Sequence, residues 1–423
     1  MSFSEHIKKK ESLYKRKKEV LIILLLGLIC ISTVFVYTYI VYSPIRPENF
    51  PVVNISTEEE INKDEYVECT LELKTKKESD NVAPLKGEIK IRGKFNAELP
   101  KKGYRIQLND DVSFLGMRED DDWMLFAMYS DLTSMQIKLS MDLYRQLRST
   151  NPTAIMPECE YVCLYINREF QGLYLLVEKN DRRLFGLDEA QNSVDSSLIF
   201  QSSYAHKNFE YYLAEEWEQD WPNEYEDIYI MEFIMNELVS FIRDCSNETF
   251  FSTEEGIYTK FDKTNLIDFY VFNFFILHDD FWDHNYFIVR NTYPSKFFLV
   301  PWDFDRCFGQ WLRRTSEPET SHEEFVLENN LLFSRLLQNQ TYRKECSIRW
   351  FELREDLWTE DKIINLLTDY YDEIKKVLDI DTNMWYHNLW SENWEEEIDK
   401  AIRNLFNWIP ERLEYCDLYF RDF

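Results

Sequence analysis

The chain has 423 residues, and 45% of them are hydrophobic and 16% aromatic, which is ample apolar material for a large core. Its formal net charge is −29, with 77 Asp and Glu residues against 48 Lys and Arg residues. Proteins that bind nucleic acid do so through a surplus of Lys and Arg. The composition therefore argues against a nucleic-acid partner and leaves both one large domain and two lobes open.

Basic residues crowd the first 18 positions, and an uncharged apolar run follows at 20–42. Such a run is long enough to cross a hydrocarbon core of about 30 Å. A cleaved signal peptide is the alternative, but its apolar segment would be shorter and a small-residue cleavage site would follow. We therefore expect a cytoplasmic basic tail at 1–18 and a transmembrane signal anchor at 19–43, with the rest of the chain outside the cell membrane.

Residues 44–62 contain three prolines and show no hydrophobic period, which predicts a linker. Apolar and polar residues then alternate at 65–75, 87–93 and 103–108, as they do in amphipathic strands. The alternation returns at 161–178 around a turn. We expect a β-rich first lobe over about 63–180.

Helical periodicity begins at 131–147, where Met135, Leu139 and Leu143 recur every four residues and Asp131 is placed to act as the N-cap. The acidic, Trp-rich stretch 186–225 shows a weaker pattern, which we interpret as an insertion. Helical patterns return at 227–244, at 264–277 and over most of 325–423. We expect an α-rich second lobe over about 181–423, and so an α+β fold.

Two acidic groups follow apolar elements between residues 278 and 309. The first comes directly after the apolar run 269–277 and consists of His278, Asp279, Asp280, Asp283, His284 and Asn285. The second, Asp303 and Asp305, follows the strand-like run 297–300. Two such groups joined by a short hairpin can converge on one cation. That arrangement suits phosphoryl transfer, which needs divalent metal, a carboxylate near the nucleophile, and cations on the phosphates.

Asp280 and Asn285 have the spacing of the kinase catalytic loop, in which the Asp serves the acceptor hydroxyl and the Asn binds metal. Asp303 would then take the place of the metal-binding Asp that follows in kinases. The spacing alone is weak evidence in so acidic a chain. Asp and Asn also favour helix ends and turns for purely local reasons.

A basic turn lies upstream of these residues. Arg92 and Gly93 end one strand-like stretch, and Lys101 and Lys102 begin the next. A Gly-containing turn beside basic residues can cover phosphate groups. An ordinary solvated hairpin is the alternative interpretation.

Four blocks in succession, at 89–108, 123–147, 161–181 and 284–309, resemble the CotH kinase family, named after spore coat protein H. That family is similar to atypical, secretory-type protein kinases. The resemblance implies a bilobal kinase-like fold, use of ATP with Mg²⁺ or Mn²⁺, and phosphorylation of Ser or Thr in a protein substrate.

The resemblance also implies roles for single residues. The acceptor hydroxyl would be served by Asp280 or, because loop length varies, by Asp279. Glu178 would lie near the adenine or merely cap its strand. The remaining roles are phosphate contact for Arg92 and Lys102, metal binding for Asn285 and Asp303, and support of a second metal or of the loop for Asp305.

Three functions stay open on the sequence. The favoured one is a membrane-anchored, extracytoplasmic kinase that acts on surface or coat proteins. A metal-dependent hydrolase would use His278 and His284, and its preference for Zn²⁺ would distinguish it. A non-catalytic surface binding protein would explain the departures from the family pattern at 94–96, Gln107 and Gln136.

Overall fold

The structure is a computed structural model that describes residues 50–203, 208–223, 226–386 and 393–423. The expected tail at 1–18 and signal anchor at 19–43 lie outside the described residues. Within the described ranges, none of the helices combines the length and the apolar character needed to cross a membrane.

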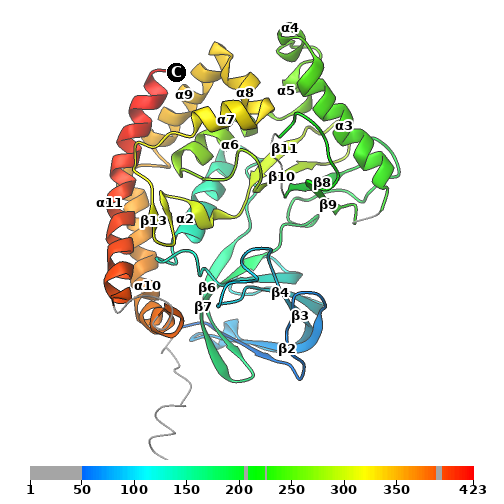
Figure 1. Cartoon of the computed structure of the whole chain (residues 1–423). Coiled ribbons are helices and arrows are strands. Elements are labelled where there is room, and N and C mark those ends of the chain that lie inside the picture. Colours follow the sequence, from blue (N-terminus) through cyan, green and yellow to red (C-terminus); the bar gives the residue numbers. More distant parts are fainter. Residues whose placement is uncertain (1–49, 204–207, 224–225, 387–392) are drawn as a thin grey trace, which may run out of the picture.

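A closed barrel of seven strands forms the lower part of the molecule, with the strand order β1-β2-β3-β4-β5-β7-β6 (Figure 1). Neighbouring strands are antiparallel, except that β1 pairs with β6 in parallel. Alternate residues such as Val53, Ile55 and Leu71 fill the barrel interior. The strands are β1 Val52–Ser56, β2 Val67–Lys74, β3 Val82–Ile91, β4 Tyr104–Val112, β5 Asp120–Phe126, β6 Cys159–Ile166 and β7 Glu169–Glu178.

The predicted linker 44–62 is wrong at its centre, because β1 runs through it. Val53 and Ile55 point into the barrel core and alternate with the outward-facing Asn54 and Ser56. The neighbouring prolines hid this short alternation in the sequence. The barrel therefore starts about ten residues earlier than the pattern predicted.

One helix, α2 (Gln136–Gln146), is inserted between β5 and β6. It begins five residues later than predicted, yet Asp131 does serve its N-terminus. One carboxylate oxygen of Asp131 accepts a hydrogen bond of 2.8 Å from the backbone N–H of Gln136, and the other accepts one of 3.0 Å from Thr133. Asp131 thus caps the helix from across an intervening turn.

The upper part of the molecule combines a sheet of order β11-β10-β8-β9 with helices (Figure 1). The expected insertion at 186–225 is wrong in part, because it contributes β8 and β9 to this sheet. The strands of this sheet are β8 Leu198–Ser202, β9 Trp217–Trp221, β10 Tyr286–Arg290 and β11 Phe298–Pro301, and a separate two-stranded sheet is formed by β12 Gln310–Trp311 and β13 Arg314–Thr315. The helices are α3 Ile228–Asp244, α4 Asn247–Phe250, α5 Ile257–Lys260, α6 Lys263–Phe275, α7 Glu323–Asn329, α8 Leu331–Leu337, α9 Gln340–Glu355, α10 Glu360–Tyr386 and α11 Trp394–Arg421.

Helix α6 is the centre of this upper part. Every side chain from Asn265 to Phe275 is buried, and the buried carboxylate of Asp268 is paired with Arg349 at 2.6 Å. Its Asn265 accepts a hydrogen bond of 2.7 Å from the backbone N–H of Leu299 in β11 and donates one of 2.9 Å to the carbonyl of the same residue. The helix thereby fixes the β10–β11 hairpin that carries the acidic residues.

A buried ion pair joins the barrel to α10. The ammonium of Lys101 lies 2.8 Å from the carboxylate of Asp381 and donates to the carbonyl of Leu173 at 2.6 Å. Asp381 also accepts from the N–H of Leu173 at 2.8 Å. Burial raises the pKa of Asp381, and the charge of Lys101 opposes that rise. Gly172 is required beside this pair, because a Cβ there would collide with the Asp381 carboxylate.

We expect Asp381→Ala to lower the free energy of unfolding by about 3–5 kcal/mol, because it leaves the Lys101 ammonium buried without a counter-charge. Chemical denaturation measures the change. The control is Asp372→Ala, which removes the exposed partner of Lys375 and should cause no measurable change. Equal effects in the two variants would contradict the importance of the buried pair.

Candidate active site

The β10–β11 hairpin brings the two acidic segments together. Tyr286 pairs with Pro301, so Asn285 stands directly before one strand and Asp303 shortly after the other. The N–H of Trp302 donates to the carbonyl of Asn285 at 2.8 Å and closes this end of the hairpin. Asn285 and Asp303 both adopt left-handed backbone conformations, with φ of 64° and 61°. Such conformations cost energy and persist where the surroundings enforce them, often at functional sites.

Asp280 lies in the loop between α6 and β10 and is held by several partners. One guanidinium nitrogen of Arg306 contacts both of its carboxylate oxygens, at 3.1 and 3.2 Å. The amide of Asn285 donates to the same carboxylate at 3.5 Å, and Nε2 of His284 lies 3.6 Å away. Burial raises the pKa of Asp280, and the charge of Arg306 opposes that rise.

Asp279 has different surroundings. Its side chain is 54% exposed, against 17% for Asp280. Its carboxylate faces His322 at 3.6 Å, and its backbone N–H donates to the carbonyl of Arg306 at 3.1 Å. Of the two candidates that the sequence left open, Asp280 is therefore the one that faces Asn285.

Asp303 and Asp305 line a small pocket together with Arg92 and Ser130. The hydroxyl of Ser130 donates to Asp305 at 2.7 Å. Burial raises the pKa of Asp305, and the negative charge of Asp303 adds to the rise. The guanidinium of Arg92 lies 4.0 Å from the ring centre of Phe126. Burial lowers the pKa of Arg92, while the charge of Asp303 acts in the opposite direction.

The pocket beside Asp303 is narrow, with a volume of about 30 Å³. That volume holds an ion or a water molecule, whereas sites for larger organic ligands measure about 300–1,000 Å³. The turn that joins β3 to β4 forms one wall of the pocket through Asn96, Leu99 and Lys101.

Residues 89–416 match the sequence profile of the family described as CotH kinase protein. The chain belongs to this family. The match confirms the resemblance that the sequence blocks indicated, and it covers the barrel from the end of β3 onward, both acidic segments and nearly all of the helical part.

One relative is the inner spore coat protein H of Bacillus subtilis (strain 168), which is 23% identical over 340 residues. The alignment covers 78% of this chain and 85% of that protein. Among solved structures, the proinflammatory kinase CtkA of Helicobacter pylori matches at 10% identity over 75% of this chain and 94% of that chain. Its TM-score is 0.27, which is too low to carry an argument about fold or function.

Two residues that the CotH resemblance pointed to are engaged elsewhere. The ammonium of Lys102 donates to the carbonyl of Ala97 at 2.7 Å within its own turn, and Lys101 lines the pocket instead. Glu178 is buried, and its two carboxylate oxygens accept from the backbone N–H groups of Arg118 and Glu158, each at 2.8 Å. The structure therefore favours strand capping over adenine contact for Glu178.

The histidines do not assemble the metal site of the hydrolase alternative. His278 is buried with its ring nitrogens 2.9 Å from the Asn273 side chain and 3.2 Å from the carbonyl of Asp303. Over the described ranges, the only group of three acidic, His or Cys side chains with ligand atoms within 4.8 Å is Asp111, Asp120 and Asp121. Arg183 pairs with all three.

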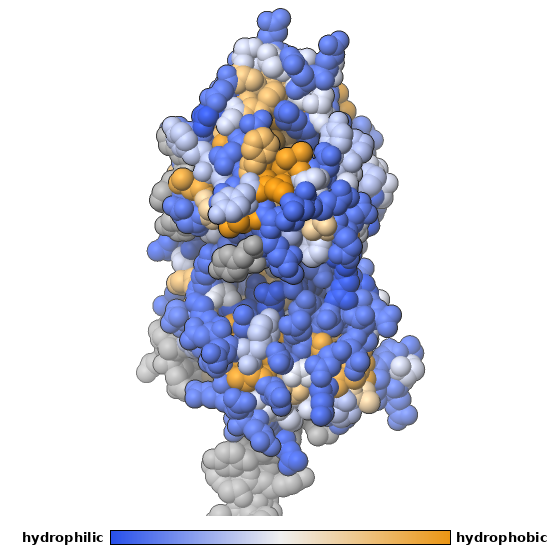
Figure 2. Space-filling view, turned by 90° about the vertical axis from the view of Figure 1, so that its right-hand side faces the viewer, coloured by the Kyte–Doolittle hydropathy of each residue, from blue (hydrophilic) through white to orange (hydrophobic). Residues whose placement is uncertain are grey.

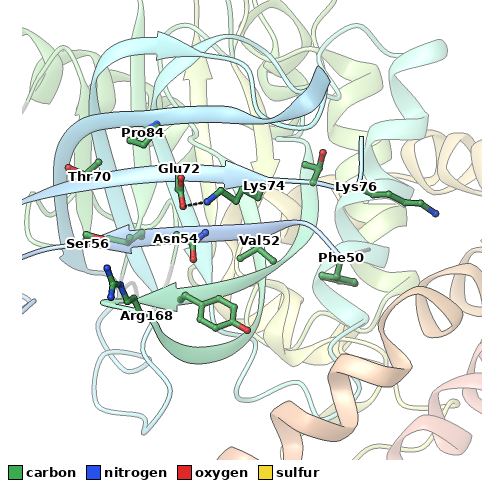
Figure 3. A pocket seen from close by; sticks show the side chains of 13 residues that line it. Phe50, Val52, Asn54, Ser56, Thr70, Glu72, Lys74, Lys76, Pro84 and Arg168 are labelled. Carbon is green, nitrogen blue, oxygen red and sulfur yellow. Dashed lines mark hydrogen bonds and ion pairs between the residues drawn. The ribbon is translucent and has the colours of Figure 1, made fainter. Parts of the chain in front are cut away.

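A larger pocket of about 610 Å³ lies on the outer face of the barrel (Figure 3). Polar side chains of β1 and β2, such as Asn54 and Thr70, line it, and Glu72 pairs with Lys74 at 2.8 Å. It shares no lining residue with the pocket at Asp303. Size therefore does not locate the candidate CotH site in this fold.

Ser130 and Arg306 are site residues that the sequence interpretation missed, and Lys101 was named only as a member of the basic turn. Arg306 directly follows Asp305, so its place in the acidic segment was a signal that could have been used. Ser130 lies 175 positions from Asp305, and no spacing rule joins residues so far apart.

We expect the stability of the protein to fall between pH 7 and pH 5 because of His278. Burial lowers the pKa of His278 to about 3, below its unfolded value of about 6.5. Its neutral form is favoured by the fold, so the stabilisation is complete above the unfolded pKa and is lost as the pH falls toward the folded pKa. The loss amounts to about 2 kcal/mol at pH 5.

The measurement compares the unfolding free energies of wild type and His278→Gln at both pH values. The variant lacks this ionisation, so the gap between the two proteins should narrow by about 2 kcal/mol on going from pH 7 to pH 5. A gap that stays constant would show that His278 is not held neutral.

Proposed function

We propose that this protein is an atypical protein kinase that transfers the γ-phosphoryl group of ATP to Ser or Thr residues of a protein. The observation that carries the proposal is the β10–β11 hairpin, which sets Asn285 beside Asp303 and next to Asp280. Membership of the CotH kinase family supports it. The barrel and the helical part would act as the two lobes of a kinase-like fold.

The residues present suit a divalent metal ion. Asp303 and Asp305 offer carboxylate oxygens, and a bound cation would oppose the rise that burial and the charge of Asp303 cause in the pKa of Asp305. The amide nitrogen of Asn285 is directed at Asp280, so its amide oxygen is directed away from that carboxylate. Mg²⁺ or Mn²⁺ takes one or two carboxylates together with phosphate oxygens and water. Such an ion would offset the charge of the phosphates.

Asp280 is the proposed acceptor of the proton from the substrate hydroxyl. It is half-buried, and the raised pKa caused by burial makes it a better base than an exposed Asp. Arg92, opposite Asp303 in the same pocket, would supply positive charge to the phosphates. Asp279 is the less favoured base because it is exposed and faces His322.

We also propose a place and an acceptor class for this activity. The basic flank at 1–18 and the apolar run at 20–42 support a single-pass anchor with the kinase outside the cell membrane. The Bacillus subtilis relative is named as a spore coat protein, which supports surface or coat proteins as acceptors.

A non-catalytic binding protein is the second candidate. The narrow pocket at Asp303, with a volume of about 30 Å³, favours it, because it leaves little room for a nucleotide.

We expect the full chain to transfer label from γ-labelled ATP, with Mg²⁺ or Mn²⁺, to itself or to an added Ser- and Thr-containing protein. Asp303→Ala and Asp280→Asn should each lower the rate at least about 100-fold, because they remove a metal ligand and the base. Asp283→Asn, which changes an acidic residue of the same loop, is the matched control and should stay close to wild type.

Equal labelling by wild type and Asp303→Ala would remove Asp303 from the mechanism. If calorimetry detects no binding of ADP in the presence of Mn²⁺, the non-catalytic function replaces the kinase.

A further inference from the structure

Arg306 occupies an unusual position between the two acidic segments. It ends the short helical turn Phe304–Arg306, whose N-cap is Asp303. From there, one nitrogen of its guanidinium contacts both oxygens of Asp280, at 3.1 and 3.2 Å. The other polar neighbours of Asp280, Asn285 and His284, are more distant, at 3.5 and 3.6 Å. Among the charged side chains around Asp280, Arg306 thus lies at the shortest distance.

Trp311 holds this guanidinium in place. The guanidinium carbon of Arg306 lies 4.1 Å from the ring centre of Trp311, within the range of a cation–π interaction. Trp311 belongs to β12, which pairs with β13 through Trp311 and Arg314. The ring of Phe95, from the turn that joins β3 to β4, lies 6.4 Å from the Trp311 ring. Contacts therefore run from that turn through Trp311 and Arg306 to Asp280.

This arrangement differs from a surface salt bridge. Exposed ion pairs contribute little, because two mobile side chains must be held in one geometry. Here both charged groups are partly buried, and stacking restrains the guanidinium. One guanidinium nitrogen contacts both carboxylate oxygens, so a rotation of the carboxylate would lengthen at least one of these contacts.

We propose that Arg306 is the positioning residue for Asp280 in the phosphoryl transfer, and that Trp311 holds Arg306 in place. The inference rests on the proposed function. Because Asp303 and Arg306 belong to the same turn, the metal ligand and the orientation of the base move together. Arg306 acts through Asp280 and need not touch the substrate.

The test measures kcat and KM for ATP in the full chain. Arg306→Gln should lower kcat about 100-fold, since a misplaced catalytic group costs that much. The KM for ATP should change less than about threefold, because the variant leaves the groups that bind ATP in the ground state unchanged. Arg306→Lys keeps the charge but loses the planar geometry, and should fall about tenfold below wild type.

Arg314→Gln is the matched control. Arg314 also lies over the Trp311 ring, at 5.2 Å, and pairs with Trp311 across the hairpin. Its removal deletes a cation from the same ring without touching Asp280, so kcat should stay within about twofold of wild type. Trp311→Leu should lower kcat about threefold to tenfold, because Arg306 loses its stacking partner.

A second measurement separates positioning from folding. In the Asp280→Asn background, Arg306→Gln should lower kcat by less than about threefold. The effects of substitutions in residues that act as a unit are not additive. Thermal unfolding and ADP binding with Mn²⁺ should match between Arg306→Gln and Arg314→Gln. Those two readouts do not depend on turnover.

Three results would overturn the role of Arg306. The first is a kcat for Arg306→Gln equal to that of Arg314→Gln. The second is a loss of kcat through Arg306→Gln that is as large in the Asp280→Asn background as in the wild type. Both require a wild type that transfers phosphate, so they leave the kinase function standing. The third is a wild type that binds ADP and transfers nothing, which overturns the kinase function and the role of Arg306 with it.

Discussion

The backbone hydrogen bond from Trp302 to Asn285, 2.8 Å long, is the contact on which the candidate site depends. It joins the residue before β10 to the residue after β11, so the acidic segments cannot separate without breaking the hairpin end. The hairpin is in turn hydrogen-bonded to Asn265 of the buried helix α6. A rigid core element therefore positions groups that stand at its surface, as functional sites require.

The site joins parts of the chain that are distant in sequence. Ser130, shortly after β5, reaches Asp305, and Arg92, at the end of β3, faces Asp303. The upper part alone would present the carboxylates, while the barrel supplies the basic and hydroxyl groups opposite them. The turn that joins β3 to β4 also carries Lys101, whose ion pair with Asp381 ties the barrel to α10. Activity would therefore depend on the relative placement of the two parts.

The features that were predicted correctly from the sequence are those that depend on neighbouring residues. The alternating strands and the cap at Asp131 follow from residues close together in the chain, and the family resemblance follows from the order of four such local blocks. Strand β1 was missed because neighbouring prolines mask its short alternation, and β8 and β9 because the weak pattern of 186–225 does not show their pairing with β10. Glu178 and Lys102 form hydrogen bonds with backbone groups, and a pattern of side chains in the sequence does not predict such bonds.

The face of the molecule that carries α3 gathers hydrophobic side chains in its upper half, while its lower half is mostly hydrophilic (Figure 2). On α3, Tyr229 and Phe233 are exposed. Single exposed aromatic residues are normal, and nothing in the structure identifies a partner for this face.

The early start of the barrel at Val52 has a consequence for reach. With the proposed anchor ending at residue 43, only residues 44–51 would separate the bilayer from the first barrel strand. A fully extended chain spans at most about 3.6 Å per residue, so this segment could reach no more than about 30 Å. Such an enzyme would work close to the lipid surface, and its acceptors would have to come to it.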